Sequence, residues 1–294
     1  MRLRSRTPNL TTLSAMMTLA VACVSAFFLP EAGASDASNR FVIISDTQNI
    51  EGVDQMTREI IELAPSFAVA VGDMPSGFDT RVSFFRRLRE ANIPIHIAMG
   101  NHDGGTKMAV RSCLPPYPFN DEVDPALRFV VENKYYYSFN RGGIHFVIVD
   151  TSTADTEQHI QWLEADLIRH VNNPKKYPTL LFMHYPDWMM GKNAGTGGPV
   201  YRVLAAHPEE HTVKAAFAGH THDGKHYPPE ETLGIPLYTL YPSAPFGDAT
   251  HTEYVVATVT PNAIAFERKA ILDEGRGKDF VIQPVKGEFG RLDK

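Results

Sequence analysis

Residues 213–222 read VKAAFAGHTH, a short apolar run that ends in two histidines one residue apart. A continuous apolar run of this length is typical of a strand that is buried on both faces of a sheet. His220 and His222 follow the expected end of that strand. The pair alone has two readings, a polar loop or two ligands of one metal site, and the rest of the chain decides between them.

The chain contains further apolar runs of the same kind, separated by segments with helical periodicity. Those runs are FVIIS (41–45), FAVAV (67–71), IPIHIAM (93–99), IHFVIV (144–149), TLLFM (179–183) and IPLYTL (235–240). Helical spacing of apolar residues occurs at 53–64, 80–91 and 155–171. Strands that alternate with helices predict an α/β architecture. The runs YVVATV (254–259) and AIAFER (263–268) are expected to complete a second sheet, followed by a fraying polar tail. Segments 104–128 and 185–199 are expected to be irregular.

The N-terminus has the pattern of a secretory signal peptide. MRLRSRTPNL (1–10) is basic, LAVACVSAFFL (19–29) is apolar, and AGA (32–34) consists of small residues. We therefore expect a signal peptide at 1–34, cleaved near Ala34, and one domain at 35–294. An uncleaved anchor and a lipoprotein are the alternatives. Cleavage would leave no stable membrane anchor and a secreted or periplasmic protein. The net charge of −6 shows no sign of a nucleic-acid-binding surface.

Polar side chains directly follow five of the apolar runs. They are Asp46 and Gln48 in DTQ (46–48), Asp73 in GD (72–73), Asn101 and His102 in GNHD (100–103), His184 after TLLFM, and His220 and His222 in GHTH (219–222). Each motif alone is compatible with an ordinary turn. The carboxyl ends of strands in an α/β sheet meet at the edge where ligands bind, so these groups can converge although they are far apart in sequence.

This ordered set resembles the calcineurin-like metallophosphoesterases, whose pattern is D-x-H, G-D, G-N-H-(D/E), H and G-H-x-H, over about residues 41–222. The resemblance implies a four-layer α-β-β-α sandwich of two mixed sheets flanked by helices, with two metal ions at the site. It would place Asp46, Gln48, Asp73 and His222 around one ion and Asp73, Asn101, His184 and His220 around the other, with Asp73 shared. His102 would lie beside the ions without binding them.

The chemistry of these groups agrees with the implied roles. Two ions a few ångströms apart need a shared ligand, and the carboxylate of Asp73 has two oxygens. Imidazole and oxygen ligands suit divalent Mn, Fe or Zn. Glycines before Asp73, Asn101 and His220 would permit tight turns. In an extended GHTH segment, alternation would send both imidazoles to one face.

The implied reaction is hydrolysis of a phosphate ester, a phosphomonoester or phosphodiester, in a small phosphorylated substrate. A hydroxide between the ions would attack phosphorus, and His102 would act as general acid toward the leaving group. Two alternatives remain open, a hydrolase of nucleotide pyrophosphate bonds and a catalytically silent metal-binding scaffold. Tyr185, Asp187 and Trp188 follow His184 and are the candidates for substrate contact.

The sequence departs from the family pattern at two positions. Gln48 stands where the family usually has histidine, and its amide oxygen is a harder and weaker ligand than imidazole. The metal there is expected to be bound more loosely, or to be Mn or Mg in preference to Zn; Gln48 not binding metal is the alternative. Ser76 stands where many members have a second Asp, which usually orients the catalytic histidine. Asp103 is adjacent to His102, and whether it takes that role is open.

Overall fold

Strand β1 (Arg40–Ile44) shows why the apolar runs are continuous. In a computed structural model of the chain, Phe41 and Ile43 pack in a core between two sheets. Val42 and Ile44 belong to a different core, between the first sheet and its helices. Both faces of the strand are therefore buried, as the absence of polar alternation predicts.

The structure describes residues 39–48, 52–103, 136–151, 157–172, 174, 177–187, 198–207, 212–244, 251–271, 280–282 and 289–292. These residues all lie within the compact unit Ser35–Lys294. The predicted signal peptide at 1–34, the predicted irregular segment 104–128 and most of the other, 185–199, with Trp188, lie outside them. Among the described residues, no helix is long and apolar enough to span a bilayer.

The first sheet contains six strands in the order β12-β11-β10-β1-β2-β3. Strands β1, β2 (Phe67–Ala70) and β3 (Ile95–Ile97) are parallel to their neighbours in this group. Strands β10 (Glu253–Thr260), β11 (Ala263–Ala270) and β12 (Phe280–Ile282) add an antiparallel half. The sheet is therefore mixed.

The second sheet also contains six strands, in the order β4-β5-β6-β7-β9-β8. Its parallel centre consists of β5 (Ile144–Ile148), β6 (Thr179–Met183), β7 (Val213–Ala218) and β9 (Leu237–Thr239). Antiparallel strands β4 (Tyr137–Arg141) and β8 (His226–Tyr227) form its two edges. Each predicted strand is present, with ends that differ from the predicted ones by at most two residues.

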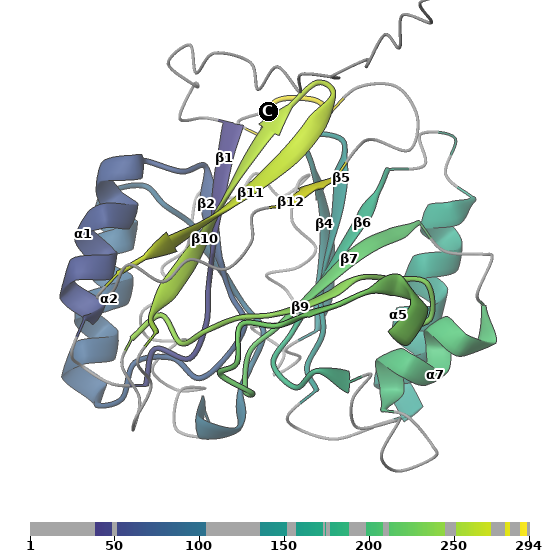
Figure 1. Cartoon of the computed structure of the whole chain (residues 1–294), viewed down its shortest axis with the longest axis horizontal. Helices are drawn as coiled ribbons and strands as arrows, with labels where there is room; N and C mark the ends of the chain where they lie inside the picture. The colour runs from purple at the N-terminus through teal and green to yellow at the C-terminus, as the bar shows by residue number, and fades with distance from the viewer. Residues whose placement is uncertain are drawn as a thin grey trace, which may run out of the picture. The chain divides into compact units, whose positions relative to one another are not determined.

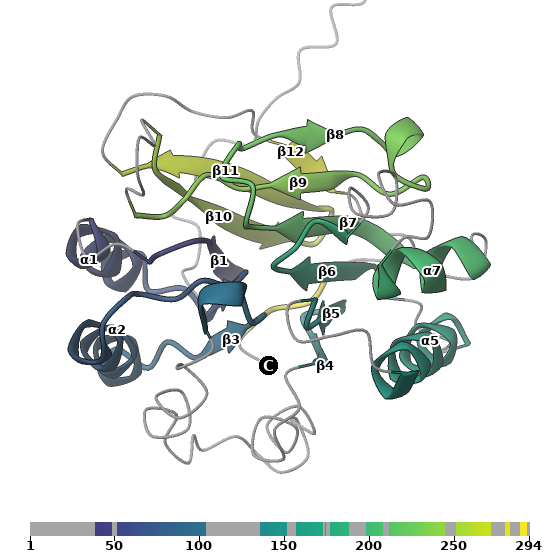
Figure 2. The same cartoon turned by 90° about the horizontal axis from the view of Figure 1, so that it is seen from below.

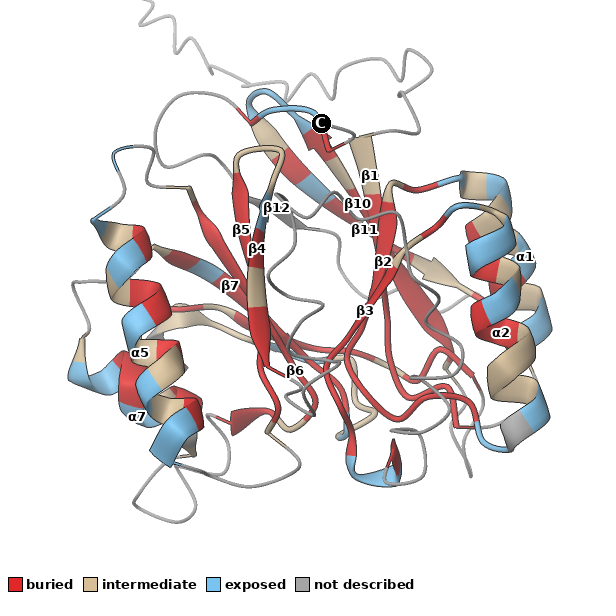
Figure 3. Cartoon of the chain, turned by 180° about the vertical axis from the view of Figure 1, so that it is seen from behind, coloured by how far each residue is buried: buried red, intermediate tan, exposed pale blue. Residues whose placement is uncertain are grey.

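Helices cover the outer face of each sheet, so the layers run α-β-β-α as expected (Figures 1 and 2). Helices α1 (Val53–Leu63) and α2 (Phe78–Glu90) lie against the first sheet. Helices α5 (Glu157–Val171) and α7 (Pro199–Ala206) lie against the second. Figure 3 shows the strands mostly buried and the helices exposed along their outer sides. Short 3-10 turns occur at Asn101–Asp103 (η2) and Pro229–Glu231 (η3).

The C-terminal region differs from the sequence-based expectation in two ways. Strands β10 and β11 join the sheet that contains β1, whereas we expected them in the second sheet; β10 pairs with β1 in antiparallel register. In addition, part of the expected fraying tail is packed, because Phe289 and Leu292 are buried in the core between the sheets. The backbone N–H of Gly290 donates to Gly142 O at 2.8 Å, which ties this segment to the β4–β5 turn.

Helix α7 was not predicted. Pro199 is its first residue and Gly198 precedes it, so the sequence resembles the end of a glycine-rich loop. Proline is compatible with the first turn of a helix because its missing N–H has no intrahelical partner there. The carboxylate of Asp187 caps the N-terminus of this helix, because it accepts a hydrogen bond from the N–H of Tyr201 at 2.6 Å.

Candidate metal centre

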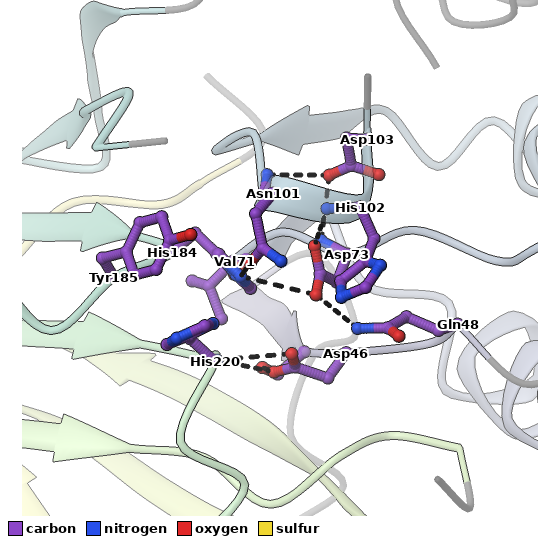
Figure 4. Close-up of polar contacts among 12 residues, drawn as sticks. Asp46, Gln48, Val71, Asp73, Asn101, His102, Asp103, His184, Tyr185 and His220 are labelled. Carbon is purple, nitrogen blue, oxygen red and sulfur yellow. Dashed lines mark hydrogen bonds and ion pairs between the residues drawn. The ribbon is translucent and has the colours of Figure 1, made fainter. Parts of the chain in front are cut away.

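The carboxyl ends of β1 and β2 bring the first two predicted ligands side by side. The parallel hydrogen-bond ladder continues past both strands, with Asp46 N–H donating to Gly72 O at 3.1 Å and Thr47 N–H to Asp73 O at 2.8 Å. Asn101 follows β3 in the same sheet. His184 follows β6 and His220 follows β7, from the second sheet, so both sheets meet at one site (Figure 4).

Three of the predicted ligands form a cluster that fits a metal ion. Asp46, Asp73 and His184 are buried, and each offers one ligand atom within 4.8 Å of the others. Two carboxylates and an imidazole make a donor set suited to a divalent transition metal. Buried carboxylates at such spacing are costly without compensating positive charge, which a cation would supply.

The other predicted ligands surround this cluster. His184 Nε2 lies 2.9 Å from Asn101 Oδ1 and 3.5 Å from Asp73 Oδ2. The side-chain amide of Gln48 contacts the same Asp73 Oδ2 from another side. His222 Nε2 lies 2.9 Å from Asp46 Oδ1. His184 and Asn101 thus lie on one side of Asp73, and Gln48 lies on another (Figure 4).

His184 is oriented by a backbone carbonyl. Its Nδ1 lies 2.8 Å from Val71 O, in the segment between β2 and Asp73. Donation from Nδ1–H fixes the tautomer in which Nε2 has a free lone pair. Nε2 is the atom that faces Asn101 and Asp73. This arrangement is the one that a metal-binding histidine needs.

The backbone at the predicted ligands is unusual. Of the seven described non-glycine residues with positive φ, four are predicted ligands, namely Asp46, Asp73, His220 and His222. Such a conformation costs on the order of 1–3 kcal/mol per residue and is concentrated at functional sites. The expectation of an extended GHTH segment was wrong, because His220 has φ 66° and His222 has φ 56°. Both imidazoles still face the site, but the turns aim them.

The glycines that precede the ligands were expected to permit tight turns, but two of the three have a different role. Gly72 has φ +95°, so its turn does need glycine. Gly100 and Gly219 are not in the positive-φ region. A Cβ at Gly219 would lie 2.5 Å from Asp46 Oδ2, and one at Gly100 would overlap the Asp73 carboxylate. These two glycines leave space for the carboxylates themselves.

The electrostatics of the cluster follow from burial and mutual contact. Burial raises the pKa of Asp73, an effect that nearby His184 opposes. Burial, together with His184, lowers the pKa of His220. The hydrogen bond with Asp46 raises the pKa of His222. The cluster thus combines acids and imidazoles whose charges depend strongly on one another.

Comparison with known proteins agrees with this geometry. A family model described as calcineurin-like phosphoesterase matches residues 39–224, more than half of the chain. The chain belongs to the calcineurin-like phosphoesterase family. Membership makes it a metal-dependent phosphoesterase, as the sequence motifs indicate. No curated protein sequence matches the chain.

Solved structures with the same fold resemble this phosphoesterase. A dimetal phosphatase from Danio rerio has 18% sequence identity and a TM-score of 0.61, over 84% of this chain and 99% of that one. GAP50, described as the anchor in the inner membrane complex of Plasmodium, has 11% identity and a TM-score of 0.54, over 84% of this chain and 89% of its own. At these identities the likeness shows the shared fold.

His102 occupies the exposed side of the phosphoesterase site. It lies in η2, and its backbone N–H donates to Asp73 Oδ1 at 2.9 Å. Within the described part of the chain, its imidazole has no hydrogen-bond partner. Ser76 is exposed and only its backbone N–H contacts the motif, donating to Gln48 O at 2.9 Å. No carboxylate therefore stands where many relatives have their second Asp.

The role of Asp103, which the sequence left open, is structural. Its carboxylate accepts from the N–H of Gly100 at 2.8 Å and from those of Asp73 and Met74 at 2.9 Å each. Asp103 is completely buried. It is therefore aimed at the backbone of the two ligand turns.

Two of the candidate substrate contacts can be placed. Tyr185 is half-buried and its ring packs against His220, with centroids 4.2 Å apart (Figure 4). Asp187 is buried, and its carboxylate caps α7. Sequence reasoning missed Asp223, which follows His222 and accepts hydrogen bonds from Thr221 and Thr239. An acid directly after the second histidine was the only available signal.

Proposed function

We propose that this phosphoesterase hydrolyses a small phosphorylated substrate, a phosphomonoester or phosphodiester, at a centre of two divalent ions. The observation that carries the proposal is the position of Asp73. Its Oδ2 faces His184 at 3.5 Å and also contacts Gln48, while its turn is bonded to the turn of Asp46. A carboxylate placed between two groups of ligands is what a shared ligand of two ions requires.

The proposed ligand sets are those that the family pattern implies. Asp46, Gln48, Asp73 and His222 would hold one ion, and Asp73, Asn101, His184 and His220 the other. When bound, such ions supply positive charge that polarises the phosphoryl group and lowers the pKa of the attacking water. Because imidazole is more abundant in the second set, that ion suits Mn, Fe or Zn. The first set, with Gln48, favours Mn or Mg.

His102 is proposed as the general acid. Its exposed position and the bond from its N–H to Asp73 Oδ1 at 2.9 Å place it at the rim of the cluster. An imidazolium there would donate its proton to the leaving alkoxide, and histidine is the side chain that most often acts in general acid–base catalysis. Asp73 thereby has two roles, since one oxygen holds the η2 turn and the other faces His184 and Gln48.

The function is tested with the purified chain, Mn²⁺ or Co²⁺, and two substrates, p-nitrophenyl phosphate and bis-p-nitrophenyl phosphate. We expect metal-dependent release of nitrophenol from at least one. His102→Ala should keep its metals and lose most turnover on an alkyl phosphate, which has a poor leaving group. Unchanged turnover on the alkyl phosphate would remove the acid role.

Two other functions are separated by the same assay. A hydrolase of nucleotide pyrophosphate bonds would cleave a nucleoside diphosphate compound faster than either nitrophenyl ester. A silent scaffold would bind metal tightly and cleave nothing. The scaffold alternative has a parallel in GAP50, which shares the fold and is described as an anchor. The buried Asp46–Asp73–His184 cluster and exposed His102 favour an active enzyme.

We also propose that residues 1–34 direct export and that the mature chain, from Ser35, is secreted or periplasmic. The support is the basic, apolar and small-residue pattern of the N-terminus. The mass of the protein recovered from the outside of expressing cells tests this. A mass that includes residues 1–34 would favour the uncleaved anchor.

A further inference from the structure

The turn that carries His220 and His222 is held in an unfavourable conformation. Both histidines have positive φ, and Thr221 lies between them. Residues in such a conformation persist only where the surrounding structure holds them. Asp46 contacts the backbone N–H of His220 and the imidazole of His222, and a further residue, Asp223, contacts the chain on both sides of His222.

The backbone at His220 is held from within the site. The N–H of Gly219 donates to His184 O at 3.1 Å. The N–H of His220 donates to the carboxylate of Asp46, at 3.1 Å to Oδ2 and 3.3 Å to Oδ1. These bonds precede Thr221 in the chain. They fix the backbone of the first histidine, whereas the second contacts Asp46 through its side chain, with Nε2 2.9 Å from Oδ1.

Asp223 holds the second half of the turn. Its Oδ1 accepts from the hydroxyl of Thr221 at 2.8 Å and from that of Thr239 at 2.5 Å. Its Oδ2 lies 2.8 Å from Lys225 Nζ and 3.4 Å from the hydroxyl of Tyr227. The carboxylate of Asp223 therefore contacts donors on both sides of His222 in the chain, and one donor in another strand, β9.

Thr239 connects this carboxylate to the sheet. It is the last residue of β9, is completely buried, and pairs in register with Ala218 at the end of β7. Its hydroxyl also accepts from the N–H of Lys225 at 2.9 Å. Asp223 thus connects the turn to the end of a strand in the second sheet.

We propose that Asp223 is a positioning residue that holds His222 in its ligand geometry and so sets the affinity of the metal beside Asp46. This inference rests on the proposed two-metal function. The bond between Thr221 and Asp223 spans His222, so its loss would remove a restraint on the backbone that carries that imidazole. Gly219 would keep its bond to His184, and His220 would keep its bond to Asp46. The effect should therefore fall on one metal rather than on both.

The test is a titration of the metal-free protein with Mn²⁺, in which free Mn²⁺ is measured by electron paramagnetic resonance. Outer groups that orient ligands typically contribute about 10–100-fold to metal affinity. We expect Asp223→Ala to weaken one of two Mn²⁺ sites about tenfold or more, and to leave the other within about threefold. Asp223→Asn should retain near wild-type affinity, because its amide oxygen can still accept from both threonines.

The matched control is Asp166→Ala. Asp166 is a buried carboxylate that, like the partly buried Asp223, accepts two side-chain bonds, here from Ser138 at 2.8 Å and from His145 at 2.9 Å. His145 lies at the amino end of β5, whereas the site lies at the carboxyl ends of the strands. This variant should lower the melting temperature and leave both Mn²⁺ sites unchanged.

The outcomes separate this inference from the proposed function. Two wild-type Mn²⁺ sites with no change in Asp223→Ala, or with both sites weakened equally, would overturn the role of Asp223 alone. A wild-type chain that binds fewer than two ions would overturn the two-metal function. Should Asp223→Ala fail to fold, Thr221→Val decides, because it removes only the hydroxyl. We expect a selective loss at one site, and unchanged affinity would overturn the inference.

Discussion

The buried carboxylate of Asp103 accepts a hydrogen bond from the backbone N–H of Asp73, at 2.9 Å. Asp73 is the proposed shared ligand of two ions, and Asp103 comes from the turn after a different strand. The GNHD motif therefore supplies a third functional group in Asp103, beside the proposed ligand Asn101 and the proposed general acid His102. It also fixes the backbone conformation of the GD motif, where Asp73 has φ 53°.

Asp103→Ala should therefore reduce both stability and metal affinity. Three backbone N–H groups, those of Gly100, Asp73 and Met74, would lose their acceptor. Because buried donors without partners are costly, we expect a loss of about 3 kcal/mol in the free energy of unfolding. Urea denaturation of the metal-free protein measures it. The control is Asp79→Ala, which removes an exposed acid on α2. Equal stability of the two variants would contradict the prediction.

Gly219→Ala should distort the site by steric overlap alone. Its added Cβ would lie 2.5 Å from Asp46 Oδ2 and 2.9 Å from Val71 O, and a backbone carbonyl cannot rotate away. We expect destabilisation of about 1–3 kcal/mol and weaker Mn²⁺ binding, measured by thermal unfolding with and without Mn²⁺. Gly290→Ala is the control, since its nearest neighbour would be 3.6 Å away. Wild-type Mn²⁺ stabilisation in Gly219→Ala would argue against the overlap.

Much of the fold was predictable because its strands are buried on both faces. Runs such as FVIIS and TLLFM are continuous, and both of their faces pack in cores. Convergence of the ligands was also predictable, because parallel strands place their carboxyl ends at one edge. Helix α7 was not, since its N-terminus depends on the distant side chain of Asp187.

The details of the site depended on contacts that no local pattern contains. The positive φ of His220 accompanies a bond from its N–H to Asp46, a residue 174 positions away. The role of Asp223 depends on Thr239, at the end of another strand. The orientation of Asp103 depends on the amides of a different motif. Residue types and spacing identify ligands, but tertiary hydrogen bonds decide how each turn is held.

Acid should destabilise the fold through two buried histidines remote from the ligand turns. Burial lowers the pKa of His96 to about 3 and that of His170 to about 4. The pKa of a histidine in the unfolded chain is about 6.5, so folding favours the neutral imidazole. Stability is then unaffected above pH 6.5 and falls as the pH drops toward the folded values. Each histidine should cost about 2 kcal/mol between pH 6.5 and pH 5.

His96→Phe should therefore reduce this acid sensitivity. The ring of His96 stacks on Phe139 with centroids 4.1 Å apart, so phenylalanine fits the same surroundings. The difference between the urea unfolding midpoints at pH 7 and pH 5, without metal, measures this acid sensitivity. Tyr137→Phe is the matched control, because it removes the hydroxyl 3.3 Å from His96 Nδ1 and keeps the titrating ring. If His96→Phe shows the same difference in urea midpoint between pH 7 and pH 5 as the wild type, groups other than His96 cause the acid sensitivity.

His222→Ala should empty one metal site more completely than His220→Ala empties the other. In the proposed sets, His222 is the only imidazole beside Asp46, whereas His184 would remain after loss of His220. Metal content measured by mass spectrometry should fall from two ions toward one per chain in His222→Ala. Retention of two ions in His222→Ala would remove His222 from the ligand set. Without a metal at His222, the contact of its Nε2 with Asp46 at 2.9 Å would serve only to join two turns.

Gln48→His should oppose the loss of metal when it is combined with His222→Ala, since imidazole is a stronger ligand than an amide oxygen for these metals. Equal metal occupancy and equal metal preference in the wild type and in Gln48→His would remove Gln48 from the ligand set.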